Sequence, residues 1–247
     1  MDRFREFLQG ANSMDAHFYK QPIISNIPAL MGLIDCWYIN YFKCPSLAVV
    51  PYDSSLELLP RYLSQLLMES NGKSVDQQGN PVSMETSSII WGGVGTNAQH
   101  AFMQLLHQGT QLVPVDFLVP VNSRTSDSAQ HGQLIANCLA QAETLMTGTT
   151  DSQLPAWRRL PGNQPGTVIV YDQLSPQTLG MILALYEHRT FVQACVWGIN
   201  PFDQWGVEQG KTIACRIQDR LEGKGDNSSN LHPATLALIE HFLKKHK

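Results

Sequence analysis

The stretch SLAVVPYDSSLELLPRYLSQLLMESNGK, residues 46–73, sets the fold class of this 247-residue chain. It opens with a continuous apolar run at 46–52 and continues at 54–69 with leucines spaced as on one side of a helix. A strand that is apolar on both faces is typical of a parallel sheet with helices on each side. The stretch therefore predicts a buried strand that leads into a helix packed on such a sheet.

Three features refine the helix predicted at 54–69. Ser54 and Glu57 have the spacing of a capping box that opens a helix. Pro60 lies inside the pattern and should kink the helix or delay its regular start. Glu69 closes it, where the partial negative charge of the last carbonyls favours cations and makes a carboxylate hold a proton more readily. Gln65, four residues earlier, shares its face. Glu69 is thus a candidate general base, although an exposed Glu at a fraying end is the commoner outcome of such spacing.

The rest of the chain repeats the alternation of strand and helix. Four further β-rich runs lie at 87–93, 112–120, 166–174 and 191–199. Helical periodicity lies at 3–10, 28–42, 97–108, 129–147, 175–189, 204–221 and 233–245. We expect an α/β fold: a three-layer α/β/α sandwich around a mostly parallel, five-stranded sheet. Two polar, Gly- and Pro-rich segments, 70–87 and 148–166, are predicted loops, the first with a small hairpin.

Composition limits the function classes. The chain is 43% hydrophobic and 15% charged, with a net charge of −4, which suits one or two domains with a substantial core. No basic block exceeds the last four residues, 244–247, so we expect no nucleic-acid partner. No apolar run reaches the roughly 20 residues of a membrane span. Five widely spaced cysteines without a Cys-x-x-Cys pair favour reduced thiols in a cytoplasmic protein.

A second candidate constellation is IIWGGVGTNAQHAF, residues 89–102. It predicts a strand, a Gly-rich turn and a helix capped near Thr96 or Asn97, with His100 in the first helical turn. The positive end of a helix favours a neutral imidazole, which can accept a proton. The alternative is an ordinary tight turn with a surface histidine, and the glycine spacing fits neither the dinucleotide fingerprint nor the P-loop.

A third constellation lies at the start of the helix predicted at 204–221. Gln204, Glu208 and Lys211 form one polar stripe, bracketed by Phe202 and Trp205, which suggests a buried setting. The alternative is a solvated face on which Glu208 and Lys211 form a plain i,i+3 pair. The chain has no His-Glu-x-x-His and no paired Cys/His spacing, so we expect no metal site.

Taken together, these stretches resemble the glucose-6-phosphate isomerase (phosphoglucose isomerase) family. The resemblance rests on MESNGK at 68–73, GTNAQHAF at 95–102, LLHQGT at 105–110, YEHRTFVQ at 186–193 and FDQWGVEQGK at 202–211. The last stretch is close to the C-terminal signature of that family. The match runs nearly end to end but covers roughly the second half of a full-length enzyme.

The resemblance implies a function and roles for particular residues. The family interconverts glucose 6-phosphate and fructose 6-phosphate through a cis-enediol, without a cofactor or metal, and works as a homodimer with composite active sites. By resemblance Glu69 carries the proton between carbons 1 and 2. His100, reaching the substrate from the neighbouring subunit, and Lys211 help to open the sugar ring. Gln65 and Gln204 are expected to contact the substrate.

The resemblance also implies what this chain lacks. Residues 1–247 correspond to one C-terminal domain of the sugar-isomerase (SIS) type with its C-terminal helices, and the N-terminal domain is absent. The family's Gly-Arg-aromatic-Ser run and its Ser/Thr-rich phosphate loop are not found. We expect a fragment of a longer enzyme with little activity alone, since one electrostatic donor is worth about 10²–10³-fold in rate. The alternatives are a phosphosugar-binding SIS module without chemistry and an extracellular interaction role.

Overall fold

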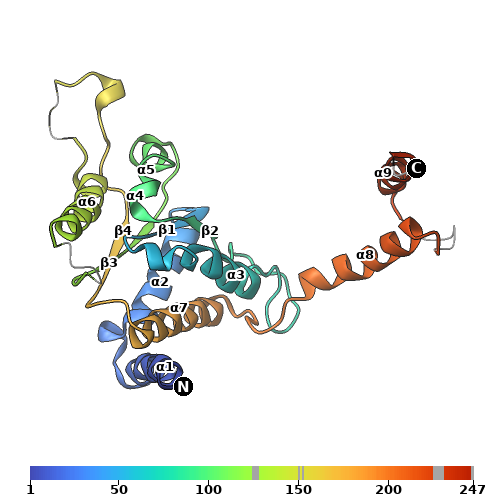
Figure 1. The fold of residues 1–247 in the computed structure, drawn as a ribbon, viewed down its shortest axis with the longest axis horizontal. Helices are drawn as coiled ribbons and strands as arrows, with labels where there is room; N and C mark the ends of the chain where they lie inside the picture. Colours follow the sequence, from blue (N-terminus) through green and yellow to red (C-terminus); the bar gives the residue numbers. More distant parts are fainter. Residues whose placement is uncertain (124–127, 150, 152, 225–230, 246–247) are drawn as a thin grey trace. The chain divides into compact units, whose positions relative to one another are not determined.

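The computed structural model describes residues 1–123, 128–149, 151, 153–224 and 231–245, which fall into two compact units, residues 1–201 and 202–247. In the first unit, Figure 1 shows a sheet with helices on both of its sides. Its helices are α1 (Asp2–Lys20), α2 (Ile27–Asn40), α3 (Leu59–Asn71), α4 (Gly95–Ala98), α5 (Met103–Gln108), α6 (Ser128–Thr147) and α7 (Pro176–Trp197). The second unit contains α8 (Glu208–Leu221) and α9 (Pro233–Lys245).

The sheet is parallel, as predicted, but has four strands and not five. The strands are β1 (Ser46–Pro51), β2 (Ile89–Gly92), β3 (Val115–Pro120) and β4 (Gly166–Tyr171), in the order β2-β1-β3-β4. The strand predicted at 191–199 is wrong, because these residues form the last turns of α7 and the turn after it. A buried helix is apolar on most sides, so its sequence resembles a buried strand.

The residues of β1 alternate between two cores. Leu47 and Val49 face a cluster with residues of α3 and α7, whereas Ala48 and Val50 face a cluster with residues of α4, α5 and α6. All four side chains are at most 4% exposed. The three-layer arrangement follows, because each face of the sheet loses its apolar surface to a different set of helices.

Helix α1 is much longer than the predicted 3–10 and packs on the outside of α7. Glycines allow the two backbones to meet: a Cβ on Gly10 would lie 1.8 Å from the carbonyl oxygen of Gln177, and a Cβ on Gly180 would lie 2.0 Å from that of Phe7. No side chain fits at either position without separating the helices. Small residues at these two points therefore set the distance between α1 and α7.

The helix predicted at 54–69 begins late. A short 3₁₀ turn occupies Ser54–Leu56, and α3 starts at Leu59 with Pro60 in its first turn, which confirms the predicted delay. The predicted capping box is wrong, because Asp53 supplies the cap and accepts from the backbone N–H of Ser55 at 2.9 Å. Within 70–87, Val75 and Pro81 form an antiparallel bridge, which confirms a small hairpin.

The helix predicted at 97–108 is interrupted. It divides into α4 and α5 at Phe102, whose ψ of 0° is not helical. His100 therefore lies in the turn between the two helices and not in a first helical turn, and its backbone N–H donates to Asn97 at 3.2 Å. The glycine-rich turn before it holds Gly95 against the ring of Tyr52, where a Cβ would lie 2.3 Å from a ring carbon.

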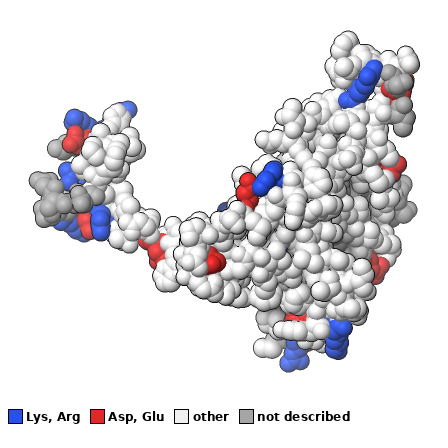
Figure 2. Space-filling model, turned by 180° about the vertical axis from the view of Figure 1, so that it is seen from behind, with Lys and Arg blue, Asp and Glu red and all other residues white. Residues whose placement is uncertain are grey.

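Charged side chains are sparse on the surface. On the face shown in Figure 2, Lys and Arg lie in small separate groups within a mostly uncharged surface. None of the helices in the described part of the chain combines the length and the apolar character needed to cross a bilayer.

Candidate active site

The structure brings Gln65 and Glu69 together on the solvent-exposed face of α3. Tyr62 lies on the same face two turns before Glu69, and its hydroxyl donates to the carboxylate of Glu187 on α7 at 3.2 Å. Burial, followed by the charge of Glu187, raises the pKa of Tyr62 to about 12, so the phenol stays protonated at neutral pH. The opposite face of α3 carries Leu63 and Leu67 into the core.

The end of α3 is closed by the three residues that follow Ser70. The backbone N–H of Gly72 donates to Met68 at 2.9 Å, and a Cβ on Gly72 would lie 2.5 Å from that same carbonyl oxygen, so the turn is built for glycine. The ammonium of Lys73 donates to the carbonyl oxygens of Glu69 at 2.9 Å and Ser70 at 2.7 Å. A cation thus caps the negative end of this helix, although its last turn carries a glutamate.

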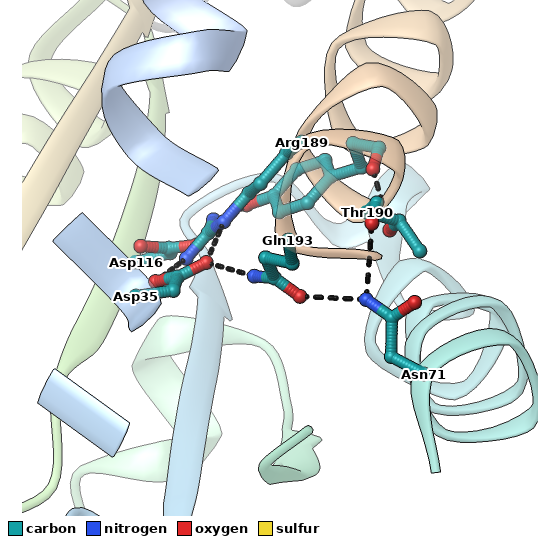
Figure 3. A network of polar contacts seen from close by, with 7 residues as sticks. Asp35, Asn71, Asp116, Arg189, Thr190 and Gln193 are labelled. Atoms are coloured by element: carbon teal, nitrogen blue, oxygen red, sulfur yellow. Dashed lines mark hydrogen bonds and ion pairs between the residues drawn. The ribbon is translucent and has the colours of Figure 1, made fainter. Parts of the chain in front are cut away.

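Asn71, the last residue of α3, ties the helix to α7. Its side-chain amide donates to the carbonyl oxygen of Thr190 at 3.0 Å and to Oε1 of Gln193 at 2.9 Å. All three residues are buried, and Asn71 is fully inaccessible. Figure 3 shows Asn71 reaching from α3 toward the side chain of Gln193.

Beyond Gln193 lies a buried ionic cluster, the Arg189 cluster, made of Arg189, Asp35, Asp116 and Tyr186. The guanidinium of Arg189 on α7 pairs with Asp35 on α2 and with Asp116 on β3, and one of its contacts, Nη2 to Oδ1 of Asp35, is 2.6 Å long. The Tyr186 hydroxyl donates to Asp116 at 3.0 Å. Gln193 donates from Nε2 to Asp35 at 2.5 Å. The cluster therefore joins α2, β3 and α7, and through Asn71 also α3 (Figure 3).

Two carboxylates share one guanidinium in this cluster, and burial makes that imbalance costly. Burial raises the pKa of Asp35, and the charge of Arg189 offsets part of that rise. Burial also disfavours the charged guanidinium, but Asp116 and Asp35 outweigh it and hold the pKa of Arg189 above its usual value. The donors on Tyr186 and Gln193 supply the hydrogen bonds that one guanidinium cannot provide to two carboxylates.

His100 and Glu69 belong to segments on opposite faces of the sheet. Leu63 and Leu67 of α3 pack into the core on one face, whereas Ala98 and Met103, on either side of His100, pack into the core on the other face. Within one copy, the sheet therefore lies between the segments that carry the two side chains.

The remaining predicted residues belong to the second unit. Lys211 on α8 is exposed and pairs with Glu208 at 2.6 Å, the plain i,i+3 pair that was the alternative interpretation. Gln204 precedes α8 and a short 3₁₀ turn, and its side chain is exposed. Phe202 and Trp205 are 78% and 76% exposed, so the expected buried setting is wrong within this unit.

Sequence reasoning missed the residues that hold the end of α3. Asp116 stands in the apolar run VDFLVP, Arg189 in the apolar pattern of α7, and Asp35 in that of α2. A charged residue inside an apolar run is the available signal, because charges are rarely buried unless paired. The partners could not be assigned from that signal, since Asn71 and Gln193 are 122 positions apart.

The described side chains include groups of the types that transfer protons. Within the described ranges, no three or more His, Cys, Asp or Glu side chains cluster as a metal site would require. Glu69 offers a carboxylate on a fixed helix end, which is the type of group that moves a proton between adjacent carbons. His100 and Lys211 are suitable types for acid/base work on hydroxyl oxygens.

Comparison with known proteins agrees with the resemblance in the sequence. A sequence model described as phosphoglucose isomerase matches residues 1–239. The glucose-6-phosphate isomerase of Marinomonas sp. is 47% identical over 99% of this chain and 47% of its own length, and that of Ectopseudomonas mendocina is 46% identical over 100% and 48%. A crystal structure of a glucose-6-phosphate isomerase from Chlamydia trachomatis superposes with a TM-score of 0.87 at 38% identity, covering 98% of this chain and 46% of that one. The chain thus spans about half the length of these relatives, and it belongs to the phosphoglucose isomerase family.

Proposed function

We propose that this chain is the proton-transferring half of an enzyme that interconverts glucose 6-phosphate and fructose 6-phosphate. The observation that carries the proposal is the placement of Glu69: an exposed carboxylate on a helix end whose backbone Lys73 and Asn71 hold in place. Family membership supplies the reaction. We propose that the complete enzyme acts in the cytoplasm, in glycolysis and gluconeogenesis.

In the proposed reaction the sugar ring opens first. One group protonates the ring oxygen while another takes the proton of the anomeric hydroxyl, and His100 and Lys211 are the groups proposed for this step. The carboxylate of Glu69 then removes the proton from carbon 2 of the open-chain aldose while the oxygen on carbon 1 takes up a proton, which leaves a cis-enediol. The same carboxyl group returns its proton to carbon 1 while the hydroxyl on carbon 2 loses one, which gives the ketose. Gln65, on the same helix face, and Gln204 are proposed to contact the sugar.

We further propose that the complete enzyme is a homodimer with active sites shared between copies. The placement of Glu69 and His100 supports this, because one copy carries them in segments on opposite faces of its sheet. A second copy can bring its own His100 to the sugar that Glu69 serves. Sedimentation of the complete isomerase tests the point, and a monomer with full activity would contradict it.

The test of the function is Glu69→Gln in the complete isomerase, meaning this chain joined to an amino-terminal half such as that of the Marinomonas relative. We expect turnover in a coupled assay to fall by at least about 100-fold, the range of a lost general base. Exchange of the carbon 2 hydrogen with solvent should fall by the same factor, while the substrate still binds. The matched control is Glu57→Gln, an exposed glutamate before α3, which should leave turnover unchanged.

The same experiment separates the proposal from a phosphosugar-binding module without chemistry. If the complete protein without any substitution binds glucose 6-phosphate but shows no isomerase turnover, the protein is a binding module and the enzyme proposal is wrong. If Glu69→Gln keeps full turnover, the assignment of the base is wrong.

A further inference from the structure

Among the described residues, none hydrogen-bonds to the carboxylate of Glu69 or forms an ion pair with it. The contact of Glu69 with Lys73 is made through its backbone carbonyl. The side chain is exposed, so packing does not fix it either. Its position therefore depends on how firmly the fold holds the backbone of the last turn of α3.

That backbone is anchored by a chain of hydrogen bonds. Both oxygens of Asp35 accept from Arg189, and Gln193 turns its NH₂ toward Asp35 as well. The Oε1 atom of Gln193 points away from Asp35 and accepts from Asn71 at 2.9 Å. The contact with Asp35 thus orients the amide of Gln193, which in turn holds the amide of the last residue of α3 (Figure 3).

The anchor is doubled and buried. The amide nitrogen of Asn71 also donates to the carbonyl oxygen of Thr190, so both of its protons are bonded to α7. Asn71, Thr190 and Gln193 are at most 3% exposed, so water does not replace these bonds. Rotation or slippage of the last turn of α3 would leave a buried amide and two buried acceptors unpaired, which is a large penalty.

We infer that Asn71 and Gln193 are positioning residues for Glu69, holding the helix end so that one carboxylate can reach two adjacent carbons of the substrate. They touch neither the sugar nor the carboxylate. The inference rests on the proposed function, in which Glu69 carries the proton. Asn71 lies in MESNGK and Gln193 in YEHRTFVQ, so the contact joins two of the stretches that carry the family resemblance.

The first test needs only this chain. Asn71→Ala should raise hydrogen exchange at the amides of residues 70–73 by at least about tenfold, because it removes both side-chain hydrogen bonds to α7. The protection of amides in β1 and β3 should change only by as much as the free energy of global unfolding changes. Exchange at 70–73 in Asn71→Ser, which retains one short donor, should lie between that of the unaltered chain and that of Asn71→Ala. The matched control is Asn40→Ala, which removes the acceptor that bonds Trp197 of the same helix α7 at 2.9 Å. It should leave exchange at 70–73 unchanged.

The second test is kinetic and uses the complete isomerase. A displaced base should lower kcat by between about 10- and 100-fold, with KM within about twofold, because Gln65 and Gln204, the residues proposed to contact the sugar, lie outside the last turn of α3. Asn71→Ala and Gln193→Ala should both show this pattern. Asn40→Ala should leave kcat within about twofold even where it lowers the melting temperature.

The outcomes separate the two proposals. If Glu69→Gln abolishes turnover but Asn71→Ala and Asn71→Ser lower kcat no more than Asn40→Ala does, the positioning inference is wrong and the function stands. If exchange at 70–73 is the same in Asn71→Ala and in the unaltered chain, the anchor does not hold the helix end and the inference fails. If Glu69→Gln keeps turnover, the proposed function fails, whatever the exchange experiment shows.

Discussion

The ammonium nitrogen of Lys73 lies 2.9 Å from the backbone carbonyl oxygen of Glu69. This contact explains how a helix can end in a carboxylate, since the cation that such an end favours is supplied by the loop four residues later. Lys73 also donates to Ser70 at 2.7 Å, and its own carbonyl oxygen accepts from the hydroxyl of Thr86 at 2.6 Å. The loop after α3 is thereby fixed to the segment that leads into β2.

We expect Lys73→Met to lower the free energy of unfolding by about 1 kcal/mol, because two helix carbonyls lose their donor and the helix end loses its cation. Urea unfolding with an unchanged m-value measures the effect. The matched control is Lys43→Met, which removes an exposed pair with Glu85 at 3.6 Å and should cost less than about 0.5 kcal/mol. Equal losses in the two variants would show that Lys73 contributes no more than a surface charge.

We expect Arg189→Met to lower the free energy of unfolding by about 3–5 kcal/mol, since Asp35 and Asp116 would remain buried without their cation. The triple variant Arg189→Met, Asp35→Leu, Asp116→Leu should recover most of this loss, because it removes the charges together. Chemical unfolding of both variants is the measurement. A single variant that loses less than about 1 kcal/mol would show that the carboxylates find other partners.

We expect Gly180→Ala to cost about 1–3 kcal/mol of stability, because the added Cβ would meet the backbone of α1 and force the two helices apart. Gly132→Ala is the matched control on α6. No atom lies within 4 Å of the Cβ position there, so alanine should stabilise the helix by about 0.5–1 kcal/mol. Thermal melts test whether Gly180→Ala lowers the stability and Gly132→Ala raises it. A Gly180→Ala protein as stable as the parent would contradict the close contact.

We expect stability to fall steeply above about pH 9. Burial raises the pKa of Cys36 and of Cys138 from an ordinary 9.0 to about 12 in the folded chain. Between these values the unfolded chain has lost the thiol protons and the folded chain has kept them, so raising the pH favours unfolding by about 1.4 kcal/mol per pH unit for each thiol. The contribution is fully present below pH 9 and is lost as the pH rises toward 12.

Urea unfolding at pH 8, 9, 10 and 11 measures that slope. Between pH 9 and 10, below the ordinary pKa of tyrosine, Cys138→Ala should remove about half of the slope, whereas substitution of the exposed Cys215 should leave it unchanged. A slope that Cys138→Ala does not alter would place the alkaline sensitivity elsewhere, for example in buried tyrosines.

Sequence pattern predicted the structure correctly where a segment determines its structure by itself. The apolar run at 46–52 forms β1 because both of its faces are buried, and Pro60 delays α3 through its own ring. It failed at 191–199, where the same apolar character belongs to a helix that packs on α1, α2 and α3. It also failed at Phe102, where the backbone interrupts a helix that the sequence pattern predicted to continue.

The residues of the candidate site were proposed from sequence motifs, whereas the contacts that hold Glu69 could not be predicted from them. The stretch MESNGK marked Glu69, but what holds Glu69 depends on partners far away in the sequence, such as Thr190, 119 positions from Asn71. The spacing of apolar residues along the sequence does not indicate which distant side chains form hydrogen bonds with one another. The roles of Glu69, His100 and Lys211 remain predictions until their variants are measured.

The placement of Glu69 and His100 on opposite faces of the sheet has a genetic consequence. In the composite arrangement proposed above, each copy of the chain contributes to two different reaction centres. Two copies, one damaged at Glu69 and the other at His100, would together still form one undamaged centre. A cell with two different defective alleles would then keep part of its enzyme, although either allele alone would leave none.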